Sequence, residues 1–409
     1  MTKLITAKAL DRVEPPAAIL ITELGRKLRA EGRSIVSLSI GEPDLGTPKH
    51  VSEGAHRAAM QGETTYSPIG GIPELKEAVR NKFKRDNGLD FEDNQVTVSA
   101  GGKQVLSNAI YATMNPGDEV VIPAPYWLAY SQMVQLYEGV PVIVQTSQDT
   151  GFKITPQALD AAITPKTKWI MLNSPGNPSG AVYSESELTA LAEVLENHKH
   201  VWILSDDMYE HLIYTDAAFK TMAQVAPQLM DRTLTVNGVS KAYAMTGWRV
   251  GFAGGPPELI KAMEMVQSQT TSGCSRVSQW AAITALNGPQ DSLGSNLEIY
   301  RKRRSLIVDG LNAIDGIQCL VPDGAFYAFP SCGAFIGGTT AGGKKLISDI
   351  DFSMALLDEK GVATVHGTAF GLSPHFRVSY AASEAEIKEA IARIGDFCES
   401  IKRRGAYGE

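Results

Sequence analysis

Lys241 lies in a segment of small, apolar and hydroxyl-bearing residues, Asn-Gly-Val-Ser-Lys-Ala-Tyr-Ala-Met-Thr-Gly-Trp-Arg-Val-Gly-Phe (237–252). A free lysine amine has a pKa of about 10.4 and is an inert ammonium at neutral pH. Burial lowers that pKa and makes the nitrogen a nucleophile that can form an imine with an aldehyde. Arg249, eight positions downstream, offers a rigid fork of donors suited to a phosphate. An isolated Ser-Lys pair is more often a surface feature. An imine-forming lysine beside a phosphate-binding arginine would describe a site for pyridoxal 5′-phosphate (PLP).

Three loops that follow predicted strands carry residues suited to the same cofactor. Gly101 and Gly102 end a strand and open a helix, so their backbone N–H groups can approach a phosphate, although a tight turn explains them equally well. Trp127 can stack on a flat ring or belong to the core. Asn177 lies in a loop with two prolines and two glycines, and it is placed to hydrogen-bond a phenolic oxygen.

Asp206 and Tyr209 follow another strand, in the run Ser-Asp-Asp-Met-Tyr-Glu. A carboxylate facing a pyridine nitrogen keeps that nitrogen protonated, which makes the ring an electron sink. Tyr209 is close enough in sequence to reach the ring oxygen. The alternative is that Asp206 is simply the N-cap of a helix. Arg377 lies within the apolar strand 376–380, where a bidentate pair with a substrate carboxylate is the favoured interpretation.

The histidines show no spacing typical of a metal site. His198 and His200 lie at a polar helix end, and His211 is expected in a helix after Tyr209. We therefore predict no metal.

Composition limits the class of protein. The chain has 409 residues, of which 44% are hydrophobic and 20% charged, with a net charge of −7. This is ordinary for a globular enzyme of two or three domains and argues against a nucleic-acid partner. No run approaches about 18 apolar residues, as a membrane helix requires. The first residues lack the apolar core of a signal peptide, and four widely spaced cysteines suit a reducing cytosol, so we expect a cytoplasmic location.

Strands and helices alternate through the middle of the chain. The predicted strands are 95–99, 119–122, 140–144, 169–172, 201–205, 233–236 and 250–253, and amphipathic helices are predicted at 102–113, 126–137, 155–163 and 184–197. Such alternation predicts an α/β fold with a mostly parallel sheet between helices. Ligands bind such sheets beyond the carboxyl ends of the strands, where the residues above fall.

The two ends of the chain predict a second, smaller α+β domain. A helix at 15–31 leads to a strand at 35–39, and a long helix at 297–313 precedes strands near 317–321, 325–329 and 376–380 and a final helix from 384. The Gly- and Thr-rich segment 333–345 is predicted to be an exposed loop. We expect a large PLP-binding domain at 46–300 and a small domain formed by 1–45 and 301–409.

These segments, in this order, resemble the fold-type I (class I/II) aminotransferases, and most closely the alphaproteobacterial aspartate aminotransferases. The resemblance extends from about Arg12 to Cys398 and rests on specific motifs. It implies that Lys241 forms the internal aldimine with PLP and later moves the proton between Cα and C4′. Asp206 would pair with the pyridine nitrogen, and Tyr209 and Asn177 would bind the ring oxygen.

The resemblance assigns the remaining contacts as well. Trp127 would stack on the ring, and the phosphate would be held by Gly101, Gly102, Ser240 and Arg249. Tyr66 matches the tyrosine that reaches the phosphate of the neighbouring subunit, which implies a homodimer with shared sites. Substrate would be bound by Gly41 and Arg377 at the α-carboxylate and by Lys103 at a distal carboxylate, beside Trp127 and Asn177. The role of Arg276, near the segment 271–278 that relatives place at the shared site, stays open.

The implied activity is ping-pong transfer of the amino group of L-aspartate to a 2-oxo acid. The family segment Lys-Pro-Ser-Ala-Thr, whose hydroxyls help bind the distal carboxylate, here reads Glu14-Pro15-Pro16-Ala17-Ala18. Loss of a charge-assisted hydrogen bond costs about 1.5–3 kcal/mol. We therefore expect weaker use of prephenate. The acceptor is expected to be 2-oxoglutarate or, as the loss of the hydroxyls favours, another oxo acid such as glyoxylate or oxaloacetate.

Three other functions remain open on the sequence. A PLP-dependent β-lyase would share Lys241, Asp206 and Arg377, and a transaminase with another amino donor would share them too. A PLP-binding regulator without enzyme activity would carry a DNA-binding module before the aminotransferase-like part, but only about forty residues precede Gly41.

Overall fold

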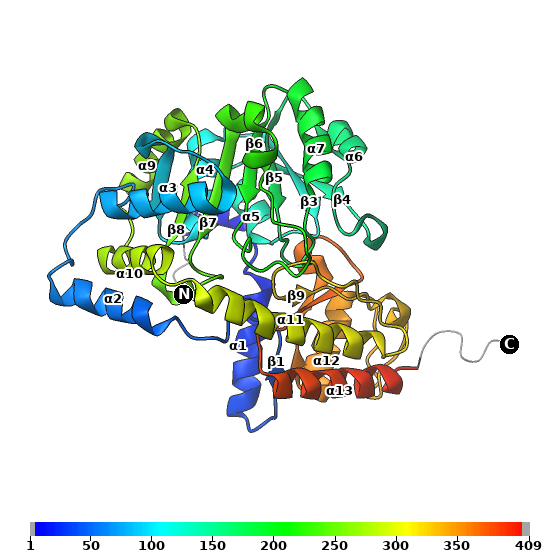
Figure 1. Ribbon diagram of the computed structural model, residues 1–409. Coiled ribbons are helices and arrows are strands. Elements are labelled where there is room, and N and C mark those ends of the chain that lie inside the picture. The colour runs from blue at the N-terminus through cyan, green and yellow to red at the C-terminus, as the bar shows by residue number, and fades with distance from the viewer. Residues whose placement is uncertain (1–4, 403–409) are drawn as a thin grey trace.

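The structure is a computed structural model that describes residues 5–402 (Figure 1). Residues 1–4 and 403–409 lie outside the described residues. Both stretches belong to the predicted small domain, and residues 1–4 also belong to the N-terminal segment in which no signal peptide is predicted. No helix in the described part of the chain is long and apolar enough to cross a membrane.

A seven-stranded sheet forms the centre of the larger unit, in the order β2-β8-β7-β6-β5-β3-β4. The strands are β2 (Val96–Ser99), β3 (Glu119–Ala124), β4 (Val140–Gln145), β5 (Thr167–Asn173), β6 (Trp202–Asp206), β7 (Thr233–Gly238) and β8 (Gly251–Gly254). Only β8 runs antiparallel to its neighbours, β2 and β7. The predicted α/β fold with a mostly parallel sheet is thereby confirmed.

Helices cover both faces of this sheet, as Figure 1 shows. One face packs against α4 (Gly102–Thr113), α5 (Ala129–Leu136) and α9 (Pro257–Thr270). The other packs against α3 (Pro73–Asn87), α6 (Pro156–Ala162), α7 (Glu185–Asn197), α8 (Met222–Val225) and α10 (Arg276–Asn287), and α2 (Lys49–Met60) contacts α10. Since both faces are covered, the central strands are mostly buried, as a parallel sheet requires, whereas the edge strand β4 is exposed at its two ends and half-buried between them.

The smaller unit joins the two ends of the chain. β1 (Val36–Ser37) pairs with β10 (Val362–Ala363), and β9 (Tyr327–Ala328), β11 (Val365–His366) and β12 (Phe376–Ser379) form a second small sheet. The helices around them are α1 (Ala17–Ala30), α11 (Asp291–Asn312), α12 (Asp349–Lys360) and α13 (Glu384–Ser400). Blue α1 and red α13 lie in the same lower part of Figure 1.

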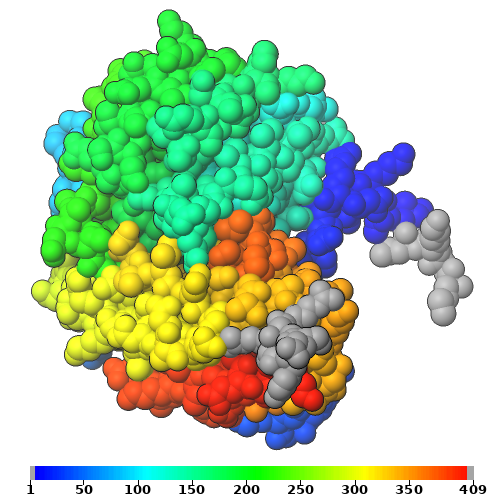
Figure 2. Space-filling model, turned by 90° about the vertical axis from the view of Figure 1, so that its right-hand side faces the viewer, coloured from blue at the N-terminus to red at the C-terminus, as the bar shows by residue number. Residues whose placement is uncertain are grey.

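Short 3₁₀ helices connect these elements. They span Lys8–Arg12, Asp93–Gln95, Gln148–Thr150, Pro227–Arg232, Thr246–Trp248, Gly333–Phe335 and Gly367–Phe370. In Figure 2 the first described residues stand out from the body of the molecule, and Ile5 is 97% exposed.

Local sequence explains where several helices begin. Ser184 and Glu187 form a capping box at the start of α7, and Ser383 and Glu386 do so at the start of α13. Proline occupies the first helical position of α3, α6 and α9, where a missing N–H is harmless.

Two predictions for the smaller unit need correction. The predicted strand at 317–321 is wrong: only an isolated bridge joins Gln318 to Ser331, because Leu320 and Val321 are 40% and 60% exposed and meet solvent where a sheet would need a neighbouring strand. The predicted exposed loop is exposed only at Ala334 and 341–345, since Phe335 is fully buried in the small-unit core and Thr340 is nearly so.

Candidate active site

A cavity of about 380 Å³ lies beyond the carboxyl ends of the parallel strands, where the smaller unit closes over the sheet. It brings together all the predicted site residues except Gly101 and Tyr66. The lining residues are Ala18, Ile40, Gly41, Glu42, Gly102, Lys103, Leu106, Trp127, Tyr130, Asn173, Asn177, Asp206, Met208, Tyr209, Ser240, Lys241, Thr246, Arg249, Tyr327 and Arg377.

The amine of Lys241 lies at the centre of this cavity. The side chain follows the end of β7, and its Nζ donates to the carbonyl oxygen of Gly41 at 2.5 Å. Nζ also lies 5.7 Å from the ring centroids of both Tyr209 and Phe326. Burial, and then the positive charge of Arg377, lower the pKa of the Lys241 amine to about 8. A substantial fraction of this amine is therefore neutral near physiological pH.

An anion-binding corner forms where α4 begins. Gly101 is the N-cap of this twelve-residue helix and has φ of 89°, a conformation that glycine adopts without strain. A Cβ on Gly101 would overlap Nη2 of Arg249, so the guanidinium lies directly against the turn. Arg249 is anchored by Nη1, which donates to the carbonyl of Thr246 at 2.8 Å. Ser240 is buried and lines the same cavity. Helix N-terminus, guanidinium and hydroxyl together suit a phosphate.

Asp206 ends β6 and is 5% exposed. Burial raises the pKa of its carboxyl group, whereas a hydrogen bond from the Tyr130 hydroxyl to Oδ2, at 2.6 Å, lowers it. Its Oδ1 accepts from the backbone N–H of Met208 at 3.3 Å. The alternative of a helix N-cap is wrong, because residues 208–211 form turns and no helix follows them directly. For the same reason the expectation that His211 lies in a helix is wrong.

Arg377 lines the same cavity and is only 3% exposed. Its Nη1 donates to Oδ1 of Asn177 at 3.0 Å and its Nη2 to the carbonyl of Ser39 at 2.6 Å. The guanidinium carbon lies 4.7 Å from the ring centroid of Tyr327 and 5.0 Å from that of Phe370. Its Nε has no hydrogen-bond partner among residues 5–402. A buried cation with an unused donor is suited to an incoming carboxylate.

Sequence reasoning missed two tyrosines that line the cavity. Tyr327, on β9, is 1% exposed, and its hydroxyl lies 2.8 Å from that of Tyr209. Nothing in the sequence near Tyr327 distinguishes it from a core aromatic residue. Tyr130 could have been predicted from the sequence, since it lies three residues after Trp127 in a predicted helix and so on the same face.

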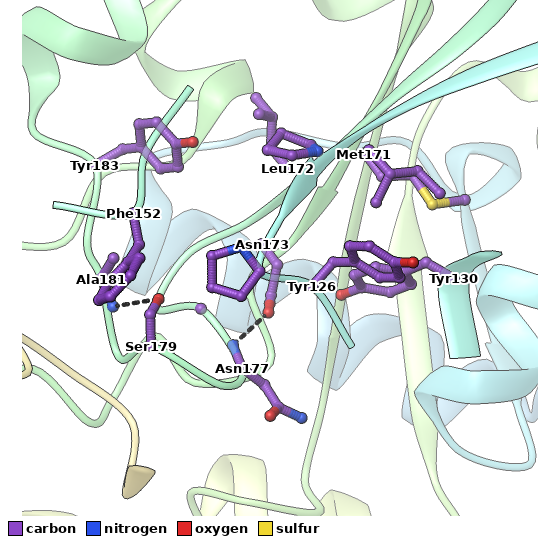
Figure 3. Close-up of a pocket in the computed structure, with 14 residues that line it drawn as sticks. Tyr126, Tyr130, Phe152, Met171, Leu172, Asn173, Asn177, Ser179, Ala181 and Tyr183 are labelled. Atoms are coloured by element: carbon purple, nitrogen blue, oxygen red, sulfur yellow. Dashed lines mark hydrogen bonds between the residues drawn. The ribbon is translucent and has the colours of Figure 1, made fainter. Parts of the chain in front are cut away.

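Beneath the cavity lies a smaller one of about 30 Å³, drawn in Figure 3. Tyr126 and Tyr130 lie together on one side of it, and the Asn173–Tyr183 loop forms the other. The Asn173 side chain accepts from the backbone N–H of Asn177 at 2.8 Å. This bond fixes the loop that presents the Asn177 amide to the main cavity.

A third chamber, of about 230 Å³, adjoins the main cavity. The two share Ala18, Lys103, Trp127 and Arg377, and the chamber is otherwise mainly apolar, with Pro16 and Glu14 in its wall. Lys103 Nζ lies 4.9 Å from the Trp127 ring centroid. Partial burial and the charge of Arg249 lower the pKa of the Lys103 amine.

Tyr66 lies outside the cavity and is 92% exposed. The loop that carries it is nevertheless held by hydrogen bonds. Arg276 donates to Glu63 at 2.5 Å, to Thr65 Oγ1 at 3.4 Å and to the Tyr66 carbonyl at 3.5 Å. Arg276 therefore contacts the Tyr66 loop and does not line the cavity.

A buried charged cluster lies behind the Tyr209 turn. Potential metal-ligand atoms of Asp86, Glu210 and His211 lie within 4.8 Å of one another. However, the ammonium of Lys82, 1% exposed, forms an ion pair with Glu210 and accounts for its charge. The cluster is satisfied as an ion-pair network that ties the turn to α3.

Comparison with known proteins identifies the family to which this chain is similar. The model of the family "Aminotransferase class I and II" matches residues 33–394. A probable aspartate/prephenate aminotransferase of Rhizobium leguminosarum bv. phaseoli is 54% identical over 97% of this chain and 99% of that protein. An aspartate aminotransferase of Rhizobium meliloti (strain 1021) is 54% identical over 91% of each chain.

Solved structures agree in fold. The crystal structure of the aspartate aminotransferase from Rhizobium meliloti has a TM-score of 0.95 and 51% identity, covering 98% of this chain and 100% of that one. The Thermus thermophilus aspartate aminotransferase with maleate has a TM-score of 0.89 and 41% identity, covering 96% and 100%. The family and fold that we expected from the motifs are thereby confirmed.

Proposed function

Because this chain belongs to aminotransferase class I and II, and is thus a PLP-dependent enzyme acting on amino and 2-oxo acids, we propose that its amino donor is L-aspartate or a similar dicarboxylic amino acid. The observation that carries the proposal is that Lys241, Arg377 and Lys103 all line one cavity. Two fixed cations beside a nucleophilic amine suit a substrate with two carboxylates.

The residues present fit PLP. The corner formed by Gly101, Gly102, Ser240 and Arg249 would hold its phosphate, since the absence of a side chain at Gly101 lets the Arg249 guanidinium lie against the start of α4. Trp127 would stack on the ring, and Asp206 would face the ring nitrogen. Oδ1 of Asn177 already accepts from Arg377, so its amide N–H₂ is left to donate to the ring oxygen beside Tyr209. When bound, PLP supplies an electron sink for the electron pair left at the substrate Cα.

The side chains of this chain transfer the proton and bind the substrate. Lys241, with a pKa near 8, accepts the proton from the substrate Cα as a general base. Arg377 orients the substrate by a bidentate contact with the α-carboxylate, next to the backbone of Gly41. Lys103, at the cavity mouth, attracts the distal carboxylate. Tyr327 and Phe370 pack on the guanidinium of Arg377 and keep water from the α-carboxylate that Arg377 binds.

A titration followed by absorbance tests the donor. L-Aspartate added to the purified PLP-loaded enzyme should shift the cofactor band to that of pyridoxamine phosphate, with one oxaloacetate formed per site and no ammonia released. An unchanged band would refute the dicarboxylic donor and leave another transaminase donor as the alternative. Ammonia released in amounts matching substrate consumption would favour the alternative of a β-lyase.

The acceptor is proposed from the wall near Ala18. Ala18 lines the main cavity and Pro16 the adjoining chamber, at the places where hydroxyls are expected in relatives. We therefore propose glyoxylate as the acceptor from L-aspartate in preference to 2-oxoglutarate, and little use of prephenate. Oxaloacetate is proposed as acceptor only with another dicarboxylic donor, because with aspartate it would merely regenerate aspartate.

The double variant Pro16→Ser/Ala18→Thr tests the acceptor. It should raise kcat/KM for 2-oxoglutarate about tenfold or more, because a hydrogen bond to a charged group contributes about 1.5–3 kcal/mol. Ala30→Ser, exposed at the end of α1, is the control. An unchanged preference among oxo acids would refute the idea.

We propose that the enzyme is a homodimer in which Tyr66 completes the partner's phosphate site. The support is a 92% exposed aromatic side chain on a loop held by Arg276 and Glu63. The native mass should be twice 44.0 kDa, and Tyr66→Phe should weaken PLP binding without changing that mass. A monomeric enzyme with full PLP affinity would refute this.

We also propose the domain division 46–300 against 1–45 with 301–409, with α11 (Asp291–Asn312) crossing the boundary, and a cytoplasmic location, which suits four buried free thiols. Hydrogen exchange that opens the two parts as separate units would support the first. Fractionation of cells would test the second.

A further inference from the structure

Tyr327 contacts both ends of the active site. It reaches the cavity from β9. Tyr327 pairs there with Ser379 of β12, which lies two positions after Arg377 in the chain. The hydroxyl lies 2.8 Å from the hydroxyl of Tyr209, and the ring lies 4.7 Å from the Arg377 guanidinium carbon. Tyr209 and Arg377 belong to different units of the fold, and Tyr327 contacts both.

We propose that Tyr327 is a positioning residue that couples the two ends of the site: its hydroxyl orients the hydroxyl of Tyr209, and its ring holds the guanidinium of Arg377. This inference rests on the proposed function, in which Tyr209 serves the cofactor oxygen and Arg377 the substrate carboxylate.

The hydrogen-bond direction follows from what each hydroxyl must do. A phenol has one proton to donate and two lone pairs to accept with. If Tyr209 donates to the cofactor oxygen, its own oxygen is free to accept, and Tyr327 is the donor within reach. Such a chain polarises both bonds and strengthens donation from Tyr209. Burial raises the pKa of both tyrosines, so each keeps its proton at neutral pH.

The ring acts on Arg377 separately from the hydroxyl. The guanidinium lies between Tyr327 and Phe370, at 4.7 and 5.0 Å from the ring centroids. Aromatic faces attract a desolvated cation and fix its plane. The Tyr327 hydroxyl also lies against Gly41, where any Cβ would overlap it. One side chain thus sets the distance between the Gly41 backbone, Arg377 and Tyr209.

The charged groups around the Tyr209 and Tyr327 hydroxyls can be named, so the effect of removing the Tyr327 hydroxyl can be isolated. The groups that face Tyr209, Tyr327 and Lys241 are Asp206, at the end of β6, Arg249, after β7, Glu42, after β1, and Arg377, on β12. None of them changes in a Tyr327→Phe variant, so a shift in titration reports the lost hydroxyl.

Tyr327→Phe tests the hydroxyl. The pH midpoint of the cofactor absorption band should rise by about half to one pH unit, since one hydrogen bond of ordinary strength is lost. The sign follows because a poorly stabilised ring oxygen retains more negative charge and holds the proton on the Lys241 nitrogen more tightly. Affinity for maleate, a four-carbon dicarboxylate, should change less than about twofold because the ring remains.

Tyr327→Leu tests the ring. Here the Kd for maleate should rise about three- to tenfold, as expected for a lost cation–ring contact. Tyr380→Phe is the control, because it removes a buried hydroxyl, bonded to the Ala325 carbonyl at 3.1 Å, from the same core without touching the cavity.

The inference is overturned if Tyr327→Phe leaves the midpoint in place, or if Tyr380→Phe shifts it equally. If Tyr327→Leu does not fold, Tyr327→Phe still decides the question. The midpoint is measured without amino acid. An enzyme that ignores aspartate would therefore refute the proposed donor while leaving this test valid.

Discussion

The part of the cavity proposed to hold the cofactor (the cofactor end) and the part proposed to hold the substrate (the substrate end) are built in different ways. At the cofactor end, Gly102, Trp127, Asp206 and Lys241 come from strand-to-loop turns of one sheet. At the substrate end, Arg377 donates to Ser39, which is 338 positions away in the chain. The first end is fixed by the sheet itself. The second exists only when two distant segments meet. Side chains of its wall other than Tyr327 can therefore vary with little effect on the cofactor.

The packing supports this contrast. The β2, β7 and β8 strands beneath the cofactor end are buried at every position, so a change there disturbs the main core. The substrate end borders the chamber near Pro16, Ala18 and Lys103, where side chains meet open space. Differences in substrate among related enzymes are therefore expected to arise in that wall. Variants at each end should separate chemistry from substrate binding.

Asp206→Asn should have the largest effect and should act on chemistry alone. Loss of the charge facing the ring nitrogen should lower kcat about 10²- to 10³-fold, as for other preorganised electrostatic contacts. Maleate affinity should stay within about threefold, because Arg377 and Lys103 are untouched. Single-turnover kinetics and a maleate titration measure the two quantities. Asp207→Asn, at the adjacent buried carboxylate outside the cavity, is the control, and an equal loss there would mean that burial of charge and not position matters.

Arg377→Lys should show the reverse pattern. An ammonium cannot reproduce the fork that contacts Asn177, Ser39 and a carboxylate together. The Kd for maleate and the KM for aspartate should each rise about a hundredfold, while the PLP dissociation constant changes little. Arg276→Lys, at an arginine outside the cavity, provides the comparison. Loss of PLP in Arg377→Lys would show that the two ends are not separable.

The two ends could be predicted from the sequence to unequal degrees, for a physical reason. Strand periodicity places residues at the carboxyl end of a sheet, so the alternating pattern alone brings Asp206, Asn177 and Gly102 to one edge. The role of Gly41 came only from the family resemblance, whereas Arg377 was predicted because an arginine within an apolar strand favours a bidentate pair with a carboxylate. Tyr327 and Phe370 were not predicted at all, because no local pattern tells which aromatic side chain of a small domain faces a cavity. The strand predicted at 317–321 failed because its apolar residues meet solvent and not a neighbouring strand.

Lys241→Met in the enzyme freed of PLP should show how much burial of the Lys241 amine lowers the free energy of unfolding. The folded-state pKa of Lys241 is about 8 against an ordinary 10.5. Between those values the unfolded chain binds more protons, so folding stability rises with pH in the wild type. The free energy of unfolding of wild type relative to Lys241→Met should therefore increase by about 2–3 kcal/mol from about pH 7.5 to about pH 10.5, the window set by the shift. Urea unfolding at both pH values measures it, with Lys166→Met, an exposed lysine, as control. A difference that does not depend on pH would mean that the amine is not desolvated.

Tyr130→Phe should have the smallest effect and tests whether the cofactor end is fixed by the sheet alone. The variant removes the hydrogen bond from the Tyr130 hydroxyl to Asp206, which lowers the pKa of that carboxyl. Without it the Asp206 pKa rises, the carboxylate is a poorer partner for a protonated ring, and PLP affinity should fall about tenfold, or about 1.4 kcal/mol. Tyr137→Phe, which removes a hydroxyl bonded to Ser107 at 2.9 Å just after the same helix, should leave PLP affinity unchanged. If Tyr130→Phe also leaves it unchanged, the strand position of Asp206 suffices. If it costs far more than about tenfold, α5 holds this end of the site as firmly as the sheet does.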